Sequence, residues 1–311
     1  MRIRVPKRRQ RTRASAVAHS LAEVFLSPAC CVLASFYKTP GLAFRFRSAL
    51  LGFRALLTRR RVLPYRDIHS MFVSPMDSVR YFEFDFAWAG VSNLRIVRYL
   101  DVSSPRLFPI LLTLEKRELQ AELLNPDFSD LDLTGRMIET LKLSGRCRLH
   151  ADLVNTAQFK DDYFDVVTSI SVVEHIPDDS QALRKMWRFL KPGGRLFLTV
   201  PCASTAYEEY VDRNEYGLLQ SKPDGFFFFQ RYYDNTLLRQ NIFSVTGEPR
   251  HYAVYGEKKP GSYHRSWKAK LSDPNYPAWR EPVLMGTEYQ YYEAIDDMPG
   301  IGVIGMEFVK A

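Results

Sequence analysis

The clearest hydrophobic pattern lies in the second half of the chain. Residues 164–173 form an apolar run rich in β-branched side chains, which predicts a parallel strand buried on both faces. An acidic pair at residues 178–179 is suited to cap a helix, and apolar side chains then recur at helical spacing through residues 183–190. Residues 192–194, Pro-Gly-Gly, are expected to end this helix before a buried strand at residues 196–200. The pattern therefore predicts a βαβ unit of a doubly wound sheet.

Weaker patterns predict the remaining elements in the same α/β order. Helices are expected from Pro105 onward and over residues 132–143, whereas the aromatic residues 73–88 are expected to be extended. Residues 257–300 are rich in Tyr and Trp, and we expect them either to cover a binding site or to shield the sheet edge. Further strands are expected at residues 98–102, 119–124, 147–151, 251–256 and 301–309.

Charge divides the chain near residue 66. Residues 1–66 contain fifteen Lys and Arg but one acid, Glu23, whereas the whole chain has a net charge of +8. The remainder is therefore net acidic, which argues against a nucleic-acid-binding body. We expect a basic helical extension over residues 1–66 and one α/β domain over residues 67–311, with no nucleic-acid partner.

The cysteine content and the N-terminal composition indicate the cellular location that we expect for this protein. The thiols have no metal-ligand spacing and too low a density for a disulfide framework, so we expect no metal site and a cytoplasmic location. Residues 1–13 are strongly basic, and both a disordered tail and a targeting segment within residues 1–40 remain open interpretations. No segment reaches the ~18 apolar residues of a membrane span. The four cysteines are Cys30, Cys31, Cys147 and Cys202.

Residues 42–61 carry an apolar stripe at helical spacing. One interpretation is a basic helix that lies in a membrane interface, which implies peripheral membrane contact. The other is a helix that packs on the domain and leaves its arginines in solvent. The stripe consists of Leu42, Phe46, Leu50, Phe53 and Leu57, and the flanking cations are Arg45, Arg47, Arg54, Arg60 and Arg61.

Residues 163–201 resemble the later half of class I S-adenosylmethionine-dependent methyltransferases of the small-molecule type, with a methyltransferase type 11-like domain. The matching residues are Phe164-Asp165-Val166-Val167, Glu174-His175, Leu190-Lys191-Pro192-Gly193-Gly194 and residues 198–201. The best-matching core is residues 98–201. The resemblance implies a Rossmann-like, mostly parallel sheet of seven strands whose last strand is antiparallel. It also implies S-adenosylmethionine as cofactor and methyl transfer to a small-molecule or lipid-linked acceptor.

The first strand end departs from the glycine-rich pattern of this family. Where the family typically has Leu-Asp-Val-Gly-Cys-Gly-Thr-Gly, residues 100–107 read Leu-Asp-Val-Ser-Ser-Pro-Arg-Leu. The resemblance assigns Asp101, Ser103 and Ser104 to the cofactor site. Ser104 followed by proline is a strong helix start, whose free amides would hold the cofactor's carboxylate. In the alternative interpretation, the side chains of residues 106 and 107 fill this space and close the site.

Acidic side chains follow the second and third strands. The family's ribose-binding acid falls on Leu123 in this chain, so the adjacent Glu122 is the candidate, with Asp127 in reserve. Asp152 matches the family's acid that accepts a hydrogen bond from the adenine amino group. It has the alternative interpretation of a surface aspartate that caps a turn.

The fourth strand ends in polar side chains. By the resemblance, Ser169, Ser171 and Glu174 line the methionine end of the cofactor. His175 is the candidate general base because the unperturbed pKa of histidine lies near neutrality, or else it orients the loop. A second interpretation of the whole chain is a non-catalytic relative that keeps the fold as a binding or scaffold module, at a membrane surface or elsewhere.

Overall fold

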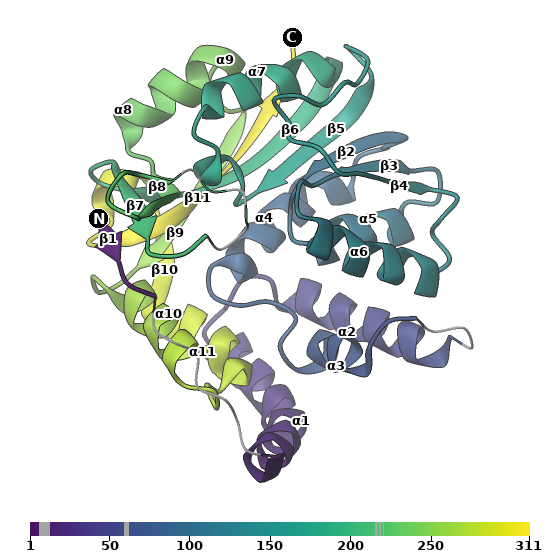
Figure 1. Cartoon of the computed structure of the whole chain (residues 1–311), viewed down its shortest axis with the longest axis vertical. Coiled ribbons are helices and arrows are strands. Elements are labelled where there is room, and N and C mark those ends of the chain that lie inside the picture. The colour runs from purple at the N-terminus through teal and green to yellow at the C-terminus, as the bar shows by residue number, and fades with distance from the viewer. Residues whose placement is uncertain (6–12, 59–61, 215–216, 218, 220) are drawn as a thin grey trace.

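The computed structural model describes residues 1–311 apart from residues 6–12, 59–61, 215–216, 218 and 220. Its centre is an eight-stranded sheet in the order β10-β9-β11-β6-β5-β2-β3-β4 (Figure 1). Strands β4, β3, β2, β5 and β6 pair in parallel, whereas β11 runs antiparallel to both β6 and β9. The strands are β2 (Arg98–Val102), β3 (Gln120–Leu124), β4 (Cys147–His150), β5 (Phe164–Ile170), β6 (Leu190–Ala203), β9 (His251–Glu257), β10 (Tyr289–Tyr292) and β11 (Ile301–Val309).

This sheet confirms the expected Rossmann-like architecture, which is mostly parallel with an antiparallel last strand. The strand number differs from the expected seven, because β10 adds an eighth strand beside β9. β10 belongs to the aromatic segment 257–300, so part of that segment extends the sheet edge. A second sheet of three strands contains β1 (Arg2–Ile3), β7 (Tyr207–Val211) and β8 (Phe227–Tyr232).

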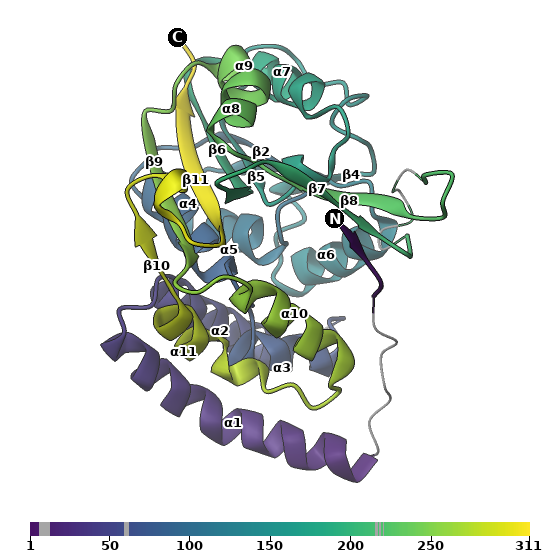
Figure 2. The same ribbon diagram turned by 90° about the vertical axis from the view of Figure 1, so that its left-hand side faces the viewer.

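Side chains that alternate along the strands face two separate hydrophobic clusters. Tyr99 and Val166 belong to the cluster that contains buried residues of α2, α4, α5 and α6, whereas their neighbours Leu100 and Val167 belong to the cluster with α7. Figure 2 shows α7 and α9 on one side of the sheet and the N-terminal helices on the other. The helices are α1 (Arg13–Phe36), α2 (Leu42–Leu57), α3 (Tyr65–Val73), α4 (Arg80–Ser92), α5 (Leu107–Glu115), α6 (Phe128–Thr140), α7 (Asp179–Phe189), α8 (Asn235–Leu237), α9 (Ser244–Thr246), α10 (Ser262–Ser272) and α11 (Glu281–Glu288), with a π-helix over Leu238–Phe243 and short 3-10 turns η1 (Val173–His175), η3 (Ala278–Arg280) and η4 (Ile295–Asp297).

The expectation of an extended segment at residues 73–88 is wrong, because α3 ends at Val73 and α4 occupies the later part. Aromatic residues favour strands in isolation, but here Tyr81 and Phe84 are fully buried where α4 packs against α2 and the sheet. Gly90 allows this close packing, because a side chain at that position would collide with the ring of Phe197 on β6. Tertiary packing therefore overrides the local preference.

The N-terminal helices lie at the end of the molecule away from the C-terminus (Figures 1 and 2). The expected helix in residues 42–61 is present as α2, while Arg60 and Arg61 lie outside the described residues. Phe44 and Leu51 of α2 join the same buried cluster as Tyr99 of the sheet, so this helix packs into the α/β core. The division of the chain at residue 66 remains a proposal from the charge pattern.

One described helix is long and apolar enough to cross a membrane, over the window His19–Phe36 of α1. This finding corrects the expectation that no segment reaches the length of a membrane span. Length and composition alone decide this test, and 17% of the window is buried against the rest of the protein.

Candidate functional site

A cavity of about 340 Å³ lies at the carboxyl ends of β5 and β6. The start of α4, the turn after β5, strand β8 and the start of β11 contribute to its walls, together with α10 and β10. Ligands of doubly wound sheets bind beyond the carboxyl ends of the strands, so this cavity is the candidate site. Its lining side chains include Arg80, Glu174, His175, Gln230, Trp267 and Tyr289.

Glu174 supplies a buried carboxyl group to this cavity. It lies in η1, directly after β5, and its Oε2 atom has no hydrogen-bond partner among the described residues. Burial raises the pKa of Glu174 to about 8, and the nearby carboxylate of Glu83 adds to the shift. The carboxyl group is therefore mostly protonated at neutral pH, where it can donate a hydrogen bond or exchange a proton.

His175, the candidate base, lies beside Glu174 and is partly buried. Its Nδ1 atom lies 2.5 Å from the carbonyl oxygen of Phe229, which can only accept a hydrogen bond. Nδ1 therefore carries the proton of the neutral ring, and the lone pair resides on Nε2, 3.9 Å from Glu174 Oε1. Burial lowers the pKa of His175 to about 4, so the ring is neutral across the physiological range.

Hydrogen bonds and an ion pair that involve Glu83 of α4 hold the turn after β5 in place. Glu83 Oε1 accepts hydrogen bonds from Ser171 Oγ and, at 2.9 Å, from Thr199 Oγ1, while Arg80 Nη1 lies 2.6 Å from Glu83 Oε2. Ser171 immediately follows β5, so these bonds connect α4 to the turn that carries Glu174. Arg80 and Glu83 are not among the residues predicted from the sequence, because this segment is predicted to be extended. Their spacing of three residues, which pairs opposite charges on a helix, is the signal that could have found them.

Asp101 braces the turn after β2 and points into the protein. It is 3% exposed, and its Oδ1 accepts hydrogen bonds from Thr168 Oγ1 at 2.7 Å and Tyr99 Oη at 3.1 Å. Its Oδ2 accepts from the Ser104 amide at 3.0 Å, and Ser104 Oγ in turn accepts from the Ile170 amide at 3.0 Å. Burial raises the pKa of Asp101 to about 6. Asp101 and Ser104 therefore tie the turn to β5.

Ser103, at the position of the first glycine in the family pattern, takes a backbone conformation that favours glycine. Its φ is 53°, in the left-handed region that favours glycine, and its amide donates a hydrogen bond to Leu124 O at 2.8 Å. The loss of the glycine therefore does not abolish the left-handed turn between β2 and α5.

Glu122, the candidate ribose-binding acid, is engaged within the protein. Its Oε2 lies 2.6 Å from His150 Nε2, and its Oε1 lies 3.6 Å from Arg148 Nη1. Side chains alternate along β3, so Glu122 and the buried Leu123 face opposite sides of the sheet. The reserve candidate Asp127 caps α6 by accepting hydrogen bonds from the first amides of that helix. A free ribose-binding acid is thus not presented by either residue.

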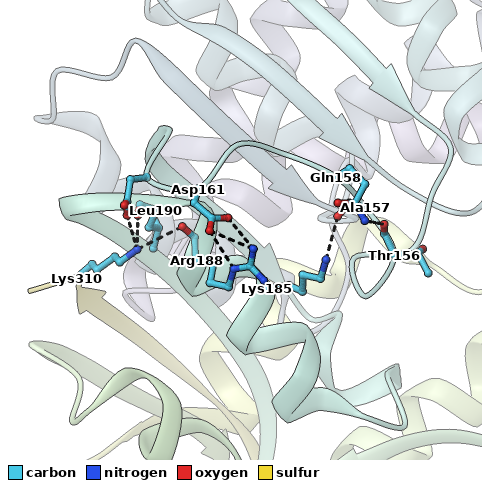
Figure 3. A network of polar contacts seen from close by, with 9 residues as sticks. Thr156, Ala157, Gln158, Asp161, Lys185, Arg188, Leu190 and Lys310 are labelled. Atoms are coloured by element: carbon cyan, nitrogen blue, oxygen red, sulfur yellow. Dashed lines mark hydrogen bonds and ion pairs between the residues drawn. The ribbon is translucent and has the colours of Figure 1, made fainter.

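Asp152 lies partly exposed after β4 and has the turn-capping geometry. Its Oδ1 accepts hydrogen bonds from the Leu153 amide at 2.7 Å and from Thr156 Oγ1 at 2.5 Å. The segment that follows is fixed to α7, where Lys185 reaches the carbonyl of Ala157 and Arg188 pairs with an aspartate, as Figure 3 shows. Asp152 therefore begins a well-anchored loop and keeps a solvent-accessible carboxylate.

The structure brings together only part of the predicted set. Ser171, Glu174 and His175 line the cavity. Ser169 is buried on β5, and its hydroxyl has no hydrogen-bond partner among the described residues. The cavity is thus distinct from the strand ends where the sequence analysis places most of the cofactor contacts, because six of the predicted residues do not line it: Asp101, Ser103, Ser104, Glu122, Asp152 and Ser169.

Comparison with known proteins gives a match to a family model over part of the chain and a shared fold. Residues 118–198 match the family model of a methyltransferase domain. The ubiquinone/menaquinone biosynthesis C-methyltransferase UbiE of Vibrio campbellii is 52% identical over 40 residues, which are 13% of this chain and 15% of that protein. The ubiquinone biosynthesis O-methyltransferase of Pseudomonas putida is 35% identical over 77 residues, 24% of this chain and 33% of that protein. The chain therefore spans no more than a third of the length of these curated relatives.

Among solved structures, the MccD protein superposes with a TM-score of 0.51 at 12% sequence identity. The superposition covers 74% of this chain and 97% of that chain, and it shows a shared fold. The family match covers β3 to most of β6, which includes the strand, helix and Pro-Gly-Gly run on which the resemblance rests.

Proposed function

We propose that this chain, whose methyltransferase-domain resemblance the family match confirms, transfers a methyl group from S-adenosylmethionine to a small-molecule acceptor. The observation that carries the proposal is the cavity at the ends of β5 and β6, where a protonated Glu174 and a neutral His175 lie side by side. A proton donor and a proton acceptor in one cavity suit an acceptor that must lose a proton when it is methylated.

The cofactor requirements are partly met by the residues at the neighbouring strand ends. Ser103 retains the left-handed turn, but α5 begins at Leu107 rather than at the predicted Pro105, and Ser104 does not cap it. In this proposal the first amides of α5 would hold the cofactor's carboxylate. Asp152 keeps an accessible carboxylate for an adenine amino group. Glu122 would have to leave His150 before it could bind a ribose. When bound, the cofactor supplies an electrophilic methyl group on sulfur.

Within the cavity we assign separate tasks to the chain's own residues. His175 Nε2 takes the acceptor's proton, and the Nδ1 bond to the carbonyl of Phe229 holds the ring in the required tautomer. Glu174 donates a hydrogen bond that orients the acceptor. The aromatic walls, among them Trp267 and Tyr289, supply apolar contact surface and exclude water. The acceptor is then a small or lipid-linked molecule that combines an apolar body with an ionisable hydroxyl or similar group.

A non-catalytic role as a binding or scaffold module is the second candidate. It is favoured by the internal partners of Asp101, Ser104 and Glu122, each of which uses its side chain to stabilise the protein. In this account the cavity binds a ligand, and no transfer follows. A cytoplasmic location and peripheral membrane contact through residues 42–61 belong to both candidate functions.

The experiment that separates the two candidates is transfer of a labelled methyl group from S-adenosylmethionine to a panel of small hydroxylated aromatic and lipid-like acceptors. Enzyme function predicts label in at least one acceptor with the wild type and a loss of roughly ten-fold or more with Glu174→Ala, which removes the donated hydrogen bond. Label in no acceptor, with intact cofactor binding, would favour the binding module.

A further inference from the structure

The helix α1 has the reverse of the polarity expected for a helix on a water-facing surface. Three of the four side chains of α1 that are buried among the described residues are polar, namely His19, Glu23 and Ser27, and the fourth is Ala34. Its outward side chains are apolar, and the phenyl rings of Phe25 and Phe36 are 75% and 78% exposed. A helix that packs on a soluble protein normally buries its apolar stripe and exposes its polar one.

Most of the stripe predicted on residues 42–61 also points outward, whereas Leu42 packs against the buried core. Phe46, Phe53 and Leu57 are 65%, 54% and 67% exposed on α2. The outward orientation is fixed by Arg45, which the sequence analysis expects to flank the stripe in solvent but which is buried. Its guanidinium donates hydrogen bonds to Ser27 Oγ of α1 at 2.6 Å and to Tyr81 Oη of α4 at 2.7 Å.

The exposed apolar side chains of the two helices gather at one end of the molecule (Figures 1 and 2), and we name them the α1–α2 face. Most of the large apolar side chains that the described part of the chain leaves exposed lie between Leu21 and Tyr65. Both helices lie at the same end of the molecule (Figures 1 and 2). Soluble monomers rarely expose apolar patches larger than a few hundred Å² without a function for them. The face consists of Leu21, Val24, Phe25, Leu26, Val32, Leu33, Phe36, Phe46, Leu50, Phe53 and Leu57.

Charge identifies what covers this face. Glu23 is the only acid in residues 1–66, against fifteen Lys and Arg, and it is buried 3.2 Å from His19 Nε2. The segment therefore offers no exposed carboxylate, whereas Lys38 and Arg54 are exposed beside the apolar side chains. An anionic phospholipid bilayer matches both properties, with an apolar interior and negative headgroups. We propose that the α1–α2 face docks on an anionic membrane surface with both helices lying in the interface.

The contacts of α1 favour this orientation over a membrane-crossing one. The Ser27 hydroxyl donates to Val73 O of α3 at 3.1 Å, and the ring of His19 packs 4.8 Å from that of Trp279 in η3. Thr39, just after the helix, donates to Pro282 O of α11 at 2.9 Å. A crossing helix would break these contacts and carry Glu23 into hydrocarbon, which is costly. The docking proposal is independent of methyl transfer.

Co-sedimentation with vesicles tests the proposal on the full chain. Wild type should bind phosphatidylglycerol-containing phosphatidylcholine vesicles at low salt, bind pure phosphatidylcholine vesicles weakly, and be released as salt screens the charges. The double variant Phe25→Ser/Phe36→Ser should lose roughly ten-fold or more of the binding, because two apolar side chains no longer enter the interface. Phe128→Ser is the matched control, since Phe128 is 74% exposed on α6, and it should bind like wild type.

Three outcomes would overturn the proposal. The first is equal binding of the double variant and wild type to anionic vesicles. The second is a wild type that ignores anionic vesicles at low salt while it forms a dimer that the double variant does not form, which assigns the face to a second copy of the chain. The third is resistance to alkaline carbonate extraction, which shows a crossing helix. Because the substituted side chains are exposed, circular dichroism should show wild-type folding of all variants.

Discussion

Nε2 of His175 lies 3.9 Å from Oε1 of Glu174, and burial shifts the pKa values of the two groups in opposite directions. The pKa of His175 falls to about 4 and that of Glu174 rises to about 8, so both groups are uncharged over most of the range between these values. Neighbouring titratable groups whose surroundings push their pKa values apart are candidates for the acid and base of a proton transfer. The pair is therefore the chemical centre of our account.

The stability of the protein should depend on pH through Glu174. Its carboxyl group holds a proton more tightly in the folded than in the unfolded state, so its contribution is complete below the unfolded pKa and is lost as pH rises toward about 8. Between pH 6 and 8 the free energy of unfolding of wild type should fall by roughly 1 kcal/mol per unit relative to Glu174→Gln. Urea denaturation at several pH values measures this difference, and parallel pH profiles for the two proteins would contradict it.

His175 should act in turnover more than in cofactor binding. His175→Asn can keep a hydrogen bond to the carbonyl of Phe229 but cannot take a proton, so kcat should fall roughly 100-fold while cofactor affinity stays within about two-fold. Steady-state kinetics and cofactor titration on the same preparation check both values. An equal loss of affinity would instead make His175 a residue that shapes the pocket.

Arg45 should be important for stability, unlike its neighbour two residues along the helix. Arg45→Ala would remove the guanidinium that donates to the hydroxyls of Ser27 and Tyr81, and would leave the carbonyl of Val73 with the Ser27 hydroxyl as donor, at a cost of about 2–4 kcal/mol. Arg47 pairs with the half-exposed Glu115 at the surface, so Arg47→Ala should cost about 0–1 kcal/mol. Thermal and urea denaturation of the two variants should separate them clearly; similar values would place Arg45 outside the core network.

Ser103 stands where the family pattern has glycine, and its left-handed backbone conformation predicts how substitutions there change the stability of the protein. Ser103→Gly relieves the left-handed strain but adds entropy to the unfolded chain and loses a hydrogen bond to Leu124 O, so stability should change by less than about 1 kcal/mol. Ser103→Val places a β-branched side chain at positive φ and should cost about 2 kcal/mol. Denaturant unfolding of both variants measures the difference, and a tolerated valine would show that the turn is not left-handed in solution.

The sequence predicts the sheet well because its strands are buried and punctuated by turn signals. The run around Phe164 defines a buried strand locally, without knowledge of distant contacts. The Pro-Gly-Gly at residues 192–194 follows the helix as expected but lies within β6, which already begins at Leu190. Other features depend on partners that lie far away in the chain. The aromatic α4 segment becomes helical because of the space between α2 and the sheet, and the burial of Asp101 depends on Thr168, 67 residues later.

Some residues of the candidate site could likewise be predicted from the sequence, and others could not. Glu174 and His175 could be placed because they immediately follow a well-predicted strand. The orientation of Glu122 could not, since a shift of one residue along a strand reverses the face and His150 lies on another strand. The outward direction of most of the apolar stripe on residues 42–61 could not be predicted from the sequence either, because it depends on the burial of Arg45.

Calorimetric titration of the full chain with S-adenosylmethionine tests the central claim most directly. Our account predicts wild-type binding with a Kd in the micromolar range, about −8 kcal/mol. Asp152→Asn should weaken binding roughly ten-fold through loss of a charge-assisted hydrogen bond, while Asp161→Asn, on the same loop but paired with Arg188, should bind like wild type. A folded wild-type protein that shows no binding at millimolar cofactor would contradict the methyltransferase function and leave only the fold.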